Sequence, residues 1–294
     1  MNVPQLRFSR RPLTLAAAFM AVVSLAIGAH AALNKRPLDA ANALTAEQND
    51  AVSGASRVAL VIGNGNYPDA GAPLAQPIND ARALTAALRR NGFDVDVVED
   101  ATRDDMARAI ARLKSRVKPG SDVMLFFGGF GVQAGRERES YMIPVDATIW
   151  KESDVRRQGF SIESVLHAMK EQGARARLAV VDASRRNPYE RRFRAYSHGL
   201  APIGAPDNSL ILTSATPGKV ADDSSGQNSV LMTELLANLN AEAASAETVF
   251  NKTRLAISRA SEGEQVPTVS SSLSEDIPLG LRAFGATATA NTGG

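Results

Sequence analysis

The chain has 294 residues, 44% of them hydrophobic, and it carries 33 Lys and Arg against 31 Asp and Glu. This length supports a complete hydrophobic core in one large domain or two small ones. The near balance of charge and the low aromatic content (5%) argue against a nucleic-acid-binding protein, whose affinity rests on clustered basic charge and stacking rings. The chain has only three histidines and no cysteine, so a metal site would have to be built from carboxylates. No loop has the spacing of calcium ligands. We therefore expect no metal and no cofactor.

The N-terminal segment has the pattern of a secretory signal. Arg7, Arg10 and Arg11 precede an apolar run over residues 13–29, and Ala29-His30-Ala31 offers small residues to a signal peptidase. The paired arginines also resemble a twin-arginine export signal. The run is shorter than the ~20 apolar residues that span a bilayer, although an uncleaved anchor is the alternative. We expect a periplasmic or extracellular protein, or one anchored to the inner membrane by this segment.

Composition divides the chain into four parts. Residues 1–32 form the signal peptide or anchor, and residues 33–56 read as a linker because they are rich in Ala, Asn, Asp and Ser without a sustained period. Residues 57–282 form one domain of ordinary size. The Ala-, Thr- and Gly-rich residues 283–294 are expected to be a disordered tail.

Within the domain, apolar β-branched runs alternate with helical patterns along the chain. We expect, in order, a strand at 57–63, a helix at 79–91 with Asn79 or Asp80 as N-cap, a strand at 93–98, a helix at 103–117, a strand at 122–127, a helix at 161–171, strands at 176–182 and 209–213, and helices at 230–239 and 247–258. This alternation predicts right-handed crossovers and a mostly parallel sheet with helices on both faces. The expected class is a three-layer α/β fold.

Two segments, at residues 126–133 and 181–189, follow runs that read as buried strands. Each therefore places small or reactive residues at the carboxyl end of the sheet, where open α/β folds put their sites.

Six segments of the domain carry a family resemblance when taken in order. They are residues 59–64 with Tyr67, 74–81, 126–133, 141–147, 181–189, and 215–218 with 220–221 and 228–229. Together they resemble the caspase-like peptidases, specifically their bacterial metacaspase-like branch. The resemblance covers roughly residues 57–281. It implies a caspase-like fold and a cysteine-type endopeptidase with a His–Cys dyad.

The sequence departs from the family at both positions of that dyad. Phe130 stands where the family has its general base, and Ser184 stands where it has its nucleophile. Phenylalanine cannot transfer a proton, and serine is a weak nucleophile until a base removes its proton. Of the three histidines, only His198 follows Ser184 closely enough to be a candidate base. We therefore expect no catalytic residue, and the alternative is a residual hydrolase using Ser184 that cleaves after basic residues.

Other parts of the family's peptide cleft remain. The resemblance assigns Asp182 to the pocket for a basic side chain, Asp80 to the same cleft, and Gly129 and Gly131 to the turn near the oxyanion. Two carboxylates in a concave site suit the forked guanidinium group of arginine. The structural alternatives are that Asp182 accepts backbone hydrogen bonds at the strand end and that the glycines serve only a tight turn.

These observations predict an exported, inactive caspase-like protein that binds a peptide or protein partner, with a basic side chain in the remnant cleft. The alternatives are the residual hydrolase and a domain that serves only as an interaction module. We expect no nucleic-acid partner, and contact with a membrane only if the N-terminal segment is retained.

Overall fold

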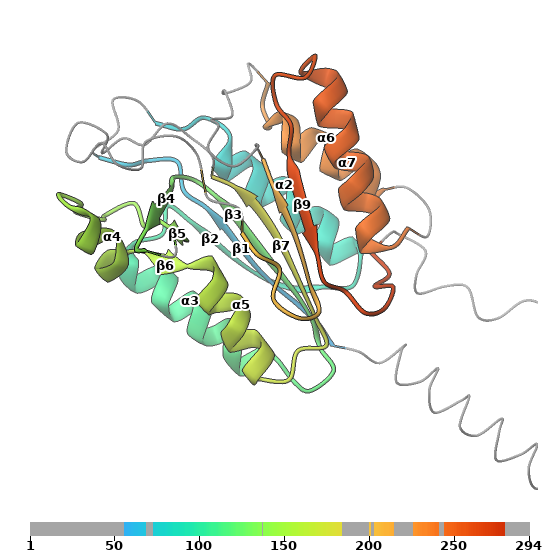
Figure 1. The fold of residues 1–294 in the computed structure, drawn as a ribbon, viewed down its shortest axis with the longest axis horizontal. Coiled ribbons are helices and arrows are strands. Elements are labelled where there is room, and N and C mark those ends of the chain that lie inside the picture. The colour runs from blue at the N-terminus through green and yellow to red at the C-terminus, as the bar shows by residue number, and fades with distance from the viewer. Residues whose placement is uncertain are drawn as a thin grey trace, which may run out of the picture. The chain divides into compact units, whose positions relative to one another are not determined.

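The computed structural model describes residues 56–68, 73–136, 138–183, 200, 203–214, 226–240 and 244–279. A six-stranded sheet lies at the centre of this region, in the order β2-β1-β3-β7-β8-β9 (Figure 1). Its strands are β1 (Arg57–Gly63), β2 (Asp94–Glu99), β3 (Asp122–Gly128), β7 (Ala176–Asp182), β8 (Ser209–Thr213) and β9 (Thr268–Ser271). The first five are parallel, and β9 pairs antiparallel with β8.

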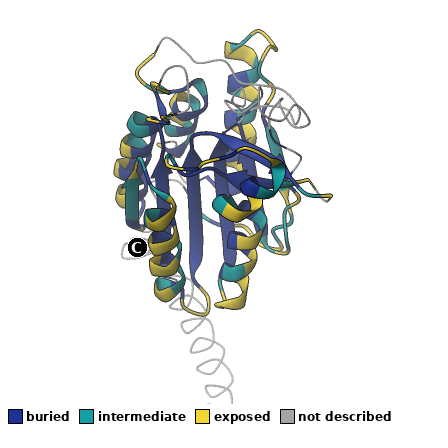
Figure 2. Cartoon of the chain, turned by 90° about the vertical axis from the view of Figure 1, so that its left-hand side faces the viewer, coloured by how far each residue is buried: buried dark blue, intermediate teal, exposed yellow. Residues whose placement is uncertain are grey.

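The central strands form where the sequence predicts them, and every one of their residues is buried. Strands β1, β3, β7 and β8 are buried along their whole length, which is why their sequences are continuous apolar runs and do not alternate. The dark central strands in Figure 2 show this burial. At the carboxyl ends, Gly63, Gly128 and Asp182 lie abreast in the ladder. We call this side of the sheet the carboxyl edge and the opposite side the amino edge.

Helices cover both faces of the sheet (Figure 1). One face packs against α2 (Pro77–Arg90), α6 (Val230–Leu239) and α7 (Ala246–Ala260), through a core that includes Leu84, Leu235 and Phe250. The other face packs against α3 (Arg103–Arg116) and α5 (Ile162–Glu171), through a core that includes Met106 and Leu166. The predicted three-layer α/β class is confirmed.

Helix α2 begins earlier than predicted. Its N-cap is Gln76, with Pro77 in the first turn, so the prediction of Asn79 or Asp80 as N-cap is wrong. Proline suits this position because its missing N–H has no partner there in any helix. Asp80 instead directs its carboxylate to a distant segment, as described below.

A second, small sheet was not predicted. It has the order β4-β5-β6, with β4 (Gly131–Ala134), β5 (Glu139–Met142) and β6 (Phe160–Ser161) antiparallel, and α4 (Glu152–Gln158) lies before its last strand. These strands and the loops around them enclose a third apolar cluster, which contains Tyr67, Phe130 and Ile143. This sheet continues directly from the carboxyl end of β3, so it positions the Gly129–Gly131 turn.

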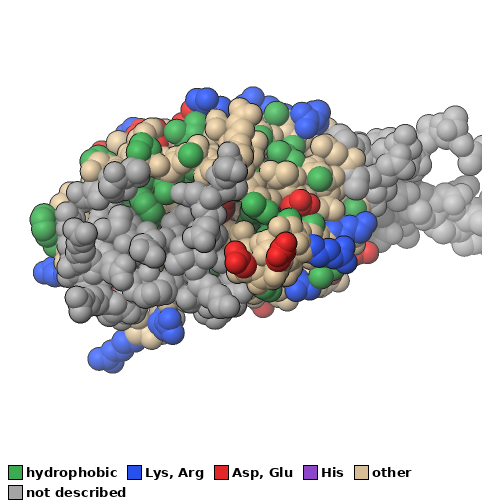
Figure 3. Space-filling view, turned by 90° about the horizontal axis from the view of Figure 1, so that it is seen from above, with side chains coloured by type: hydrophobic (Ala, Val, Ile, Leu, Met, Phe, Trp, Pro, Cys, Tyr) green, Lys and Arg blue, Asp and Glu red, His purple; other side chains and the backbone are tan. Residues whose placement is uncertain are grey.

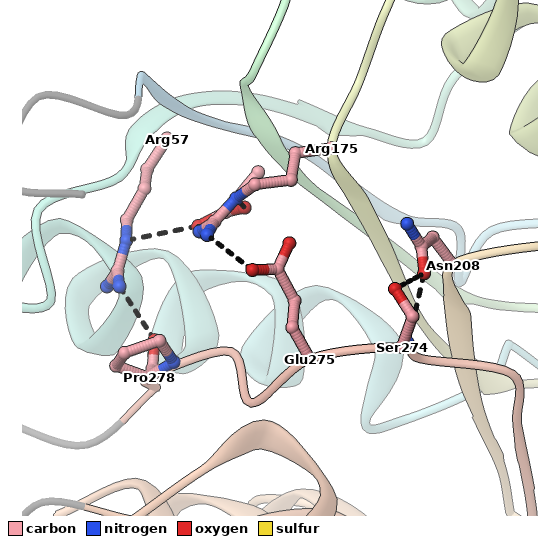
Figure 4. A network of polar contacts seen from close by, with 7 residues as sticks. Arg57, Arg175, Asn208, Ser274, Glu275 and Pro278 are labelled. Carbon is pink, nitrogen blue, oxygen red and sulfur yellow. Dashed lines mark hydrogen bonds and ion pairs between the residues drawn. The ribbon is translucent and has the colours of Figure 1, made fainter. Parts of the chain in front are cut away.

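A network of charges joins the two ends of the domain at the amino edge (Figure 4). Asp122 is buried, and its two carboxylate oxygens accept hydrogen bonds of 3.0 and 2.8 Å from Arg175. Arg57 lies 3.8 Å from the same carboxylate and donates a 2.7 Å hydrogen bond to the carbonyl of Pro278. Glu275 lies 3.5 Å from Arg175. These contacts hold the segment before the C-terminus against the start of β1.

Candidate functional site

The turn between β3 and β4, Gly129–Phe130–Gly131, lies at the carboxyl edge. All three of its backbone N–H groups are engaged. Gly129 donates to the carbonyl of Asp182 at 3.2 Å, Phe130 to the hydroxyl of Tyr67 at 3.1 Å, and Gly131 to the carbonyl of Ala183 at 3.1 Å. An oxyanion hole needs donors aimed at the developing charge. This turn supplies none unless one of these hydrogen bonds is broken.

Both glycines of the turn are required by close packing. A Cβ atom at Gly129 would lie 2.6 Å from the hydroxyl of Tyr67 and 2.9 Å from the ring of Phe127. A Cβ atom at Gly131 would lie 2.6 Å from Leu200 and 3.0 Å from Ala183. The absence of a side chain at these positions therefore has a sufficient steric reason.

Phe130 is a packed apolar side chain. It is 5% exposed, and its ring centroid lies 4.6 Å from that of Tyr67, at an interplanar angle of 58°. The hydroxyl of Tyr67 donates to the carbonyl of Ile143 at 2.9 Å while it accepts from Phe130, which fixes both rings. An aromatic ring in the third apolar cluster thus occupies the position that the resemblance gives to the general base.

Ser184 and His198 lie outside the described residues, so the predicted loss of the nucleophile and the possible Ser184–His198 pair stay predictions from the sequence. His167 is described, and it lies on α5 with its side chain 65% exposed and 3.5 Å from Glu171. It belongs to a surface hollow of about 280 Å³ lined by Glu139, Glu163, Ser164, His167, Ala168 and Glu171. Neither the Gly129–Gly131 turn nor Asp80 or Asp182 lines this hollow.

Two buried carboxylates lie at the carboxyl edge. Asp80, in the first turn of α2, is 0% exposed, and Asp182, the last residue of β7, is 2% exposed. Burial, followed by the repulsion of Asp182, raises the pKa of Asp80 to about 6, although hydrogen bonds from Asn228 and Ser229 oppose the shift. Asp80 and Asp182, named from the sequence, are therefore close enough to interact.

Asp80 is held by a segment far away in the sequence. Its Oδ1 atom accepts a 2.8 Å hydrogen bond from the Asn228 side chain and a 3.0 Å hydrogen bond from the backbone of Ser229, the N-cap of α6. Its Oδ2 atom is buried and has no hydrogen-bond partner among the described residues. One oxygen thus ties α2 to α6, while the other is left with unused capacity to accept a hydrogen bond.

The sequence analysis missed Ser214, which follows β8 at the same edge. Ser214 is 0% exposed, and its backbone donates to the carbonyl of Val181, the residue before Asp182. Its Oγ atom has no hydrogen-bond partner within the described part of the chain. A single serine after a strand is a weak signal, and only the register of β7 and β8 identifies it as part of the site.

The described residues contain no group of three or more His, Asp or Glu placed to hold a metal ion. Within the same residues, no helix has both the length and the apolar character needed to cross a membrane. Among the described residues visible in Figure 3, Lys and Arg side chains lie in separate groups with Asp and Glu between some of them, so no single charge covers the described part of this face.

Residues 56–278 match the family model of the caspase domain, the peptidase C14 family. The match spans most of the chain and the whole of the sheet just described, so this protein belongs to the caspase-domain family. The predicted family is thereby confirmed. A search of curated proteins found no match.

Proposed function

We propose that this chain is an exported caspase-domain protein that binds a peptide or protein through a basic side chain and does not cleave it. The observation that carries the proposal is the buried Asp80 carboxylate, which is repelled by Asp182 and whose Oδ2 atom lacks a hydrogen-bond partner among the described residues. A like-charged buried pair is unfavourable on its own, and a cation between the two groups reverses that balance.

The chemistry of the pair favours a guanidinium or ammonium group. A guanidinium group offers five N–H donors, enough for the free oxygen of Asp80, for Asp182 and for the hydroxyl of Ser214. Because Asp80 and Asp182 are 0% and 2% exposed, the ligand must displace the atoms that cover them. Each ligand hydrogen bond then forms in a water-poor environment, where it is strongest.

Three features support the loss of catalysis. Phe130 and Ser184 replace the residues that the family uses as base and nucleophile. The three N–H groups of the Gly129–Gly131 turn are all engaged within the protein. Loss of a base or nucleophile in a hydrolase costs roughly a millionfold in turnover, which leaves binding as the activity to measure.

Export follows from the signal pattern in residues 1–32 and remains part of the proposal. Fractionation of cells expressing the full chain tests it, since a cleaved, soluble periplasmic form and a full-length form in the membrane fraction differ in size and location. A full-length protein in the cytosol would contradict it.

The test for catalysis uses fluorogenic peptides ending in Arg or Lys. We expect no release of the fluorophore above the rate seen with a Ser184→Ala variant. A measurable rate that Ser184→Ala abolishes would overturn the proposal in favour of the residual hydrolase. Absence of both cleavage and peptide binding would favour the alternative that the domain serves only as an interaction module.

A further inference from the structure

Arg177, the second residue of β7, has a buried side chain with two nitrogen atoms that find no hydrogen-bond partner among the described residues. It is 1% exposed and is among the largest fully buried side chains of the described residues. Its Nε and Nη1 atoms have no hydrogen-bond partner there, and no carboxylate of the described residues lies within 4.0 Å to form an ion pair. A buried charge without partners is strongly unfavourable, so such a group in a folded protein calls for a ligand.

Ser209, the first residue of β8, is a second unpartnered polar group beside it. Arg177 and Ser209 are direct neighbours in the parallel ladder. Two residues further along, Ala179 and Ile211 both belong to the core on the α3 and α5 side, so Arg177 and Ser209 share that face of the sheet. Ser209 is 0% exposed, and its Oγ atom has no hydrogen-bond partner within the described residues.

The nearby charges do not neutralise Arg177. Asp207 is close enough to oppose the lowering of the Arg177 pKa that burial causes, but its carboxylate pairs with Lys170 at 2.6 Å. The other arginines of the amino edge, Arg57 and Arg175, are balanced by Asp122 and Glu275 (Figure 4). Among the described residues, the positive charge of Arg177 therefore remains uncompensated.

We propose that Arg177 and Ser209 bind a small monovalent anion, with chloride as the representative ion. The guanidinium N–H groups and the serine hydroxyl donate to it, which satisfies these donors and neutralises the buried charge. The proximity of Asp207 disfavours a divalent anion, and the near-complete burial of both side chains disfavours a large one. The site lies at the amino edge and is separate from the proposed peptide cleft.

Anomalous diffraction from crystals of the protein grown or soaked in sodium bromide tests the site directly. We expect a bromide peak within hydrogen-bond distance of the Arg177 guanidinium group and the Ser209 hydroxyl. Density without an anomalous signal would mean a water molecule, and a guanidinium group turned to the Asp207 carboxylate would mean an internal ion pair. Either result would overturn the proposal.

Thermal unfolding tests the site in solution. We expect sodium chloride to raise the melting temperature in a saturable way, compared with sodium gluconate at the same ionic strength. Arg177→Met removes this difference, and Ser209→Ala weakens the apparent affinity for chloride by about threefold to tenfold. Arg82→Met, which removes an exposed arginine paired with Glu99, is the matched control and keeps the chloride effect. A chloride effect of the same size in Ser209→Ala and in the wild type would contradict the proposal even if Arg177→Met fails to fold.

Discussion

Buried carboxylates at the two edges of the central sheet have opposite electrostatic surroundings. At the amino edge, the buried Asp122 carboxylate forms ion pairs with both Arg57 and Arg175. Figure 4 shows the two arginines. At the carboxyl edge, Asp80 meets Asp182, a group of the same sign, and one of its oxygens has no hydrogen bond among the described residues. The first arrangement stabilises the fold. The second costs stability through the repulsion between the two carboxylates, and the cationic ligand proposed above would offset that cost.

The largest expected effect comes from breaking the amino edge. Asp122→Ala leaves Arg57 and Arg175 without their shared partner, and removal of one member of a buried ion pair costs about 3–5 kcal/mol. We expect a loss of this size in the free energy of unfolding, measured by chemical denaturation. Glu99→Ala, which removes an exposed pair with Arg82, is the control and costs less than about 1 kcal/mol. Equal effects of the two substitutions would show that the network does not hold the domain ends.

At the carboxyl edge, the Gly129–Gly131 turn is tightly packed. Gly129→Ala places a Cβ atom 2.6 Å from the hydroxyl of Tyr67. We expect this overpacking to lower the free energy of unfolding by about 1–3 kcal/mol. Gly204→Ala is the control, because a Cβ atom there meets nothing within 4 Å. Thermal unfolding of both variants measures the difference. A neutral Gly129→Ala would mean that the Tyr67–Phe130 packing is loose and that the turn is free to rearrange.

The carboxylate pair itself gives the opposite sign. Asp80→Asn keeps an oxygen that can accept from Asn228 and Ser229 but removes the repulsion with Asp182. The raised pKa of Asp80 is equivalent to about 2–3 kcal/mol of lost stability at pH 8. We expect the variant to recover about 1–2 kcal/mol of this and so to be more stable than the wild type at pH 8. A less stable variant at pH 8 would mean that the Asp80 charge serves the fold.

The same substitution has a defined pH dependence. The pKa of Asp80 in the folded protein is about 6, above its ordinary value of 3.8. The contribution of Asp80 to the stability of the fold is therefore fully present below pH 3.8 and is lost as the pH rises through about 6. The wild type should therefore lose more stability than Asp80→Asn between these values. Denaturation of both proteins across this range measures the difference, and parallel curves would contradict the raised pKa.

The smallest effect is expected at Ser214. Ser214→Ala removes a buried hydroxyl that has no partner among the described residues, so the free energy of unfolding should change by less than about 0.5 kcal/mol. Binding of a basic peptide should weaken in the same variant, by about threefold to tenfold. A large loss of stability would place Ser214 in the structural network of the sheet.

The sequence predicts the central sheet well and the small sheet not at all. Strands β1, β7 and β8 have their predicted bounds because strands buried on both faces have continuous apolar sequences. The two-residue strand β6 and the glycine-led β4 carry no such signal, because their pairing depends on partners elsewhere in the chain. The antiparallel strand β9, with the sequence Thr-Val-Ser-Ser, was missed for the same reason.

The site shows the same limit. The family resemblance points to Asp80 and Asp182, but the local signal at Asp80 is that of a helix N-cap, and that prediction is wrong. The carboxylate is used by Asn228 and Ser229, 148 and 149 residues away, which no local pattern reveals. Ser214 and the three engaged N–H groups of the turn likewise depend on the tertiary structure.

Binding of an Arg-ended peptide to the wild type and to Asp80→Asn, measured by calorimetry at pH 8, tests the central claim most directly. A matched peptide ending in citrulline, which has the shape of arginine without its charge, is the control. We predict that the wild type binds the Arg-ended peptide without cleaving it. Either change, Asp80→Asn in the protein or citrulline in the peptide, should weaken binding about tenfold or more. Equal affinity of the wild type and Asp80→Asn for the Arg-ended peptide, or no binding to the wild type, would contradict the claim that the carboxyl edge is a site for a basic side chain.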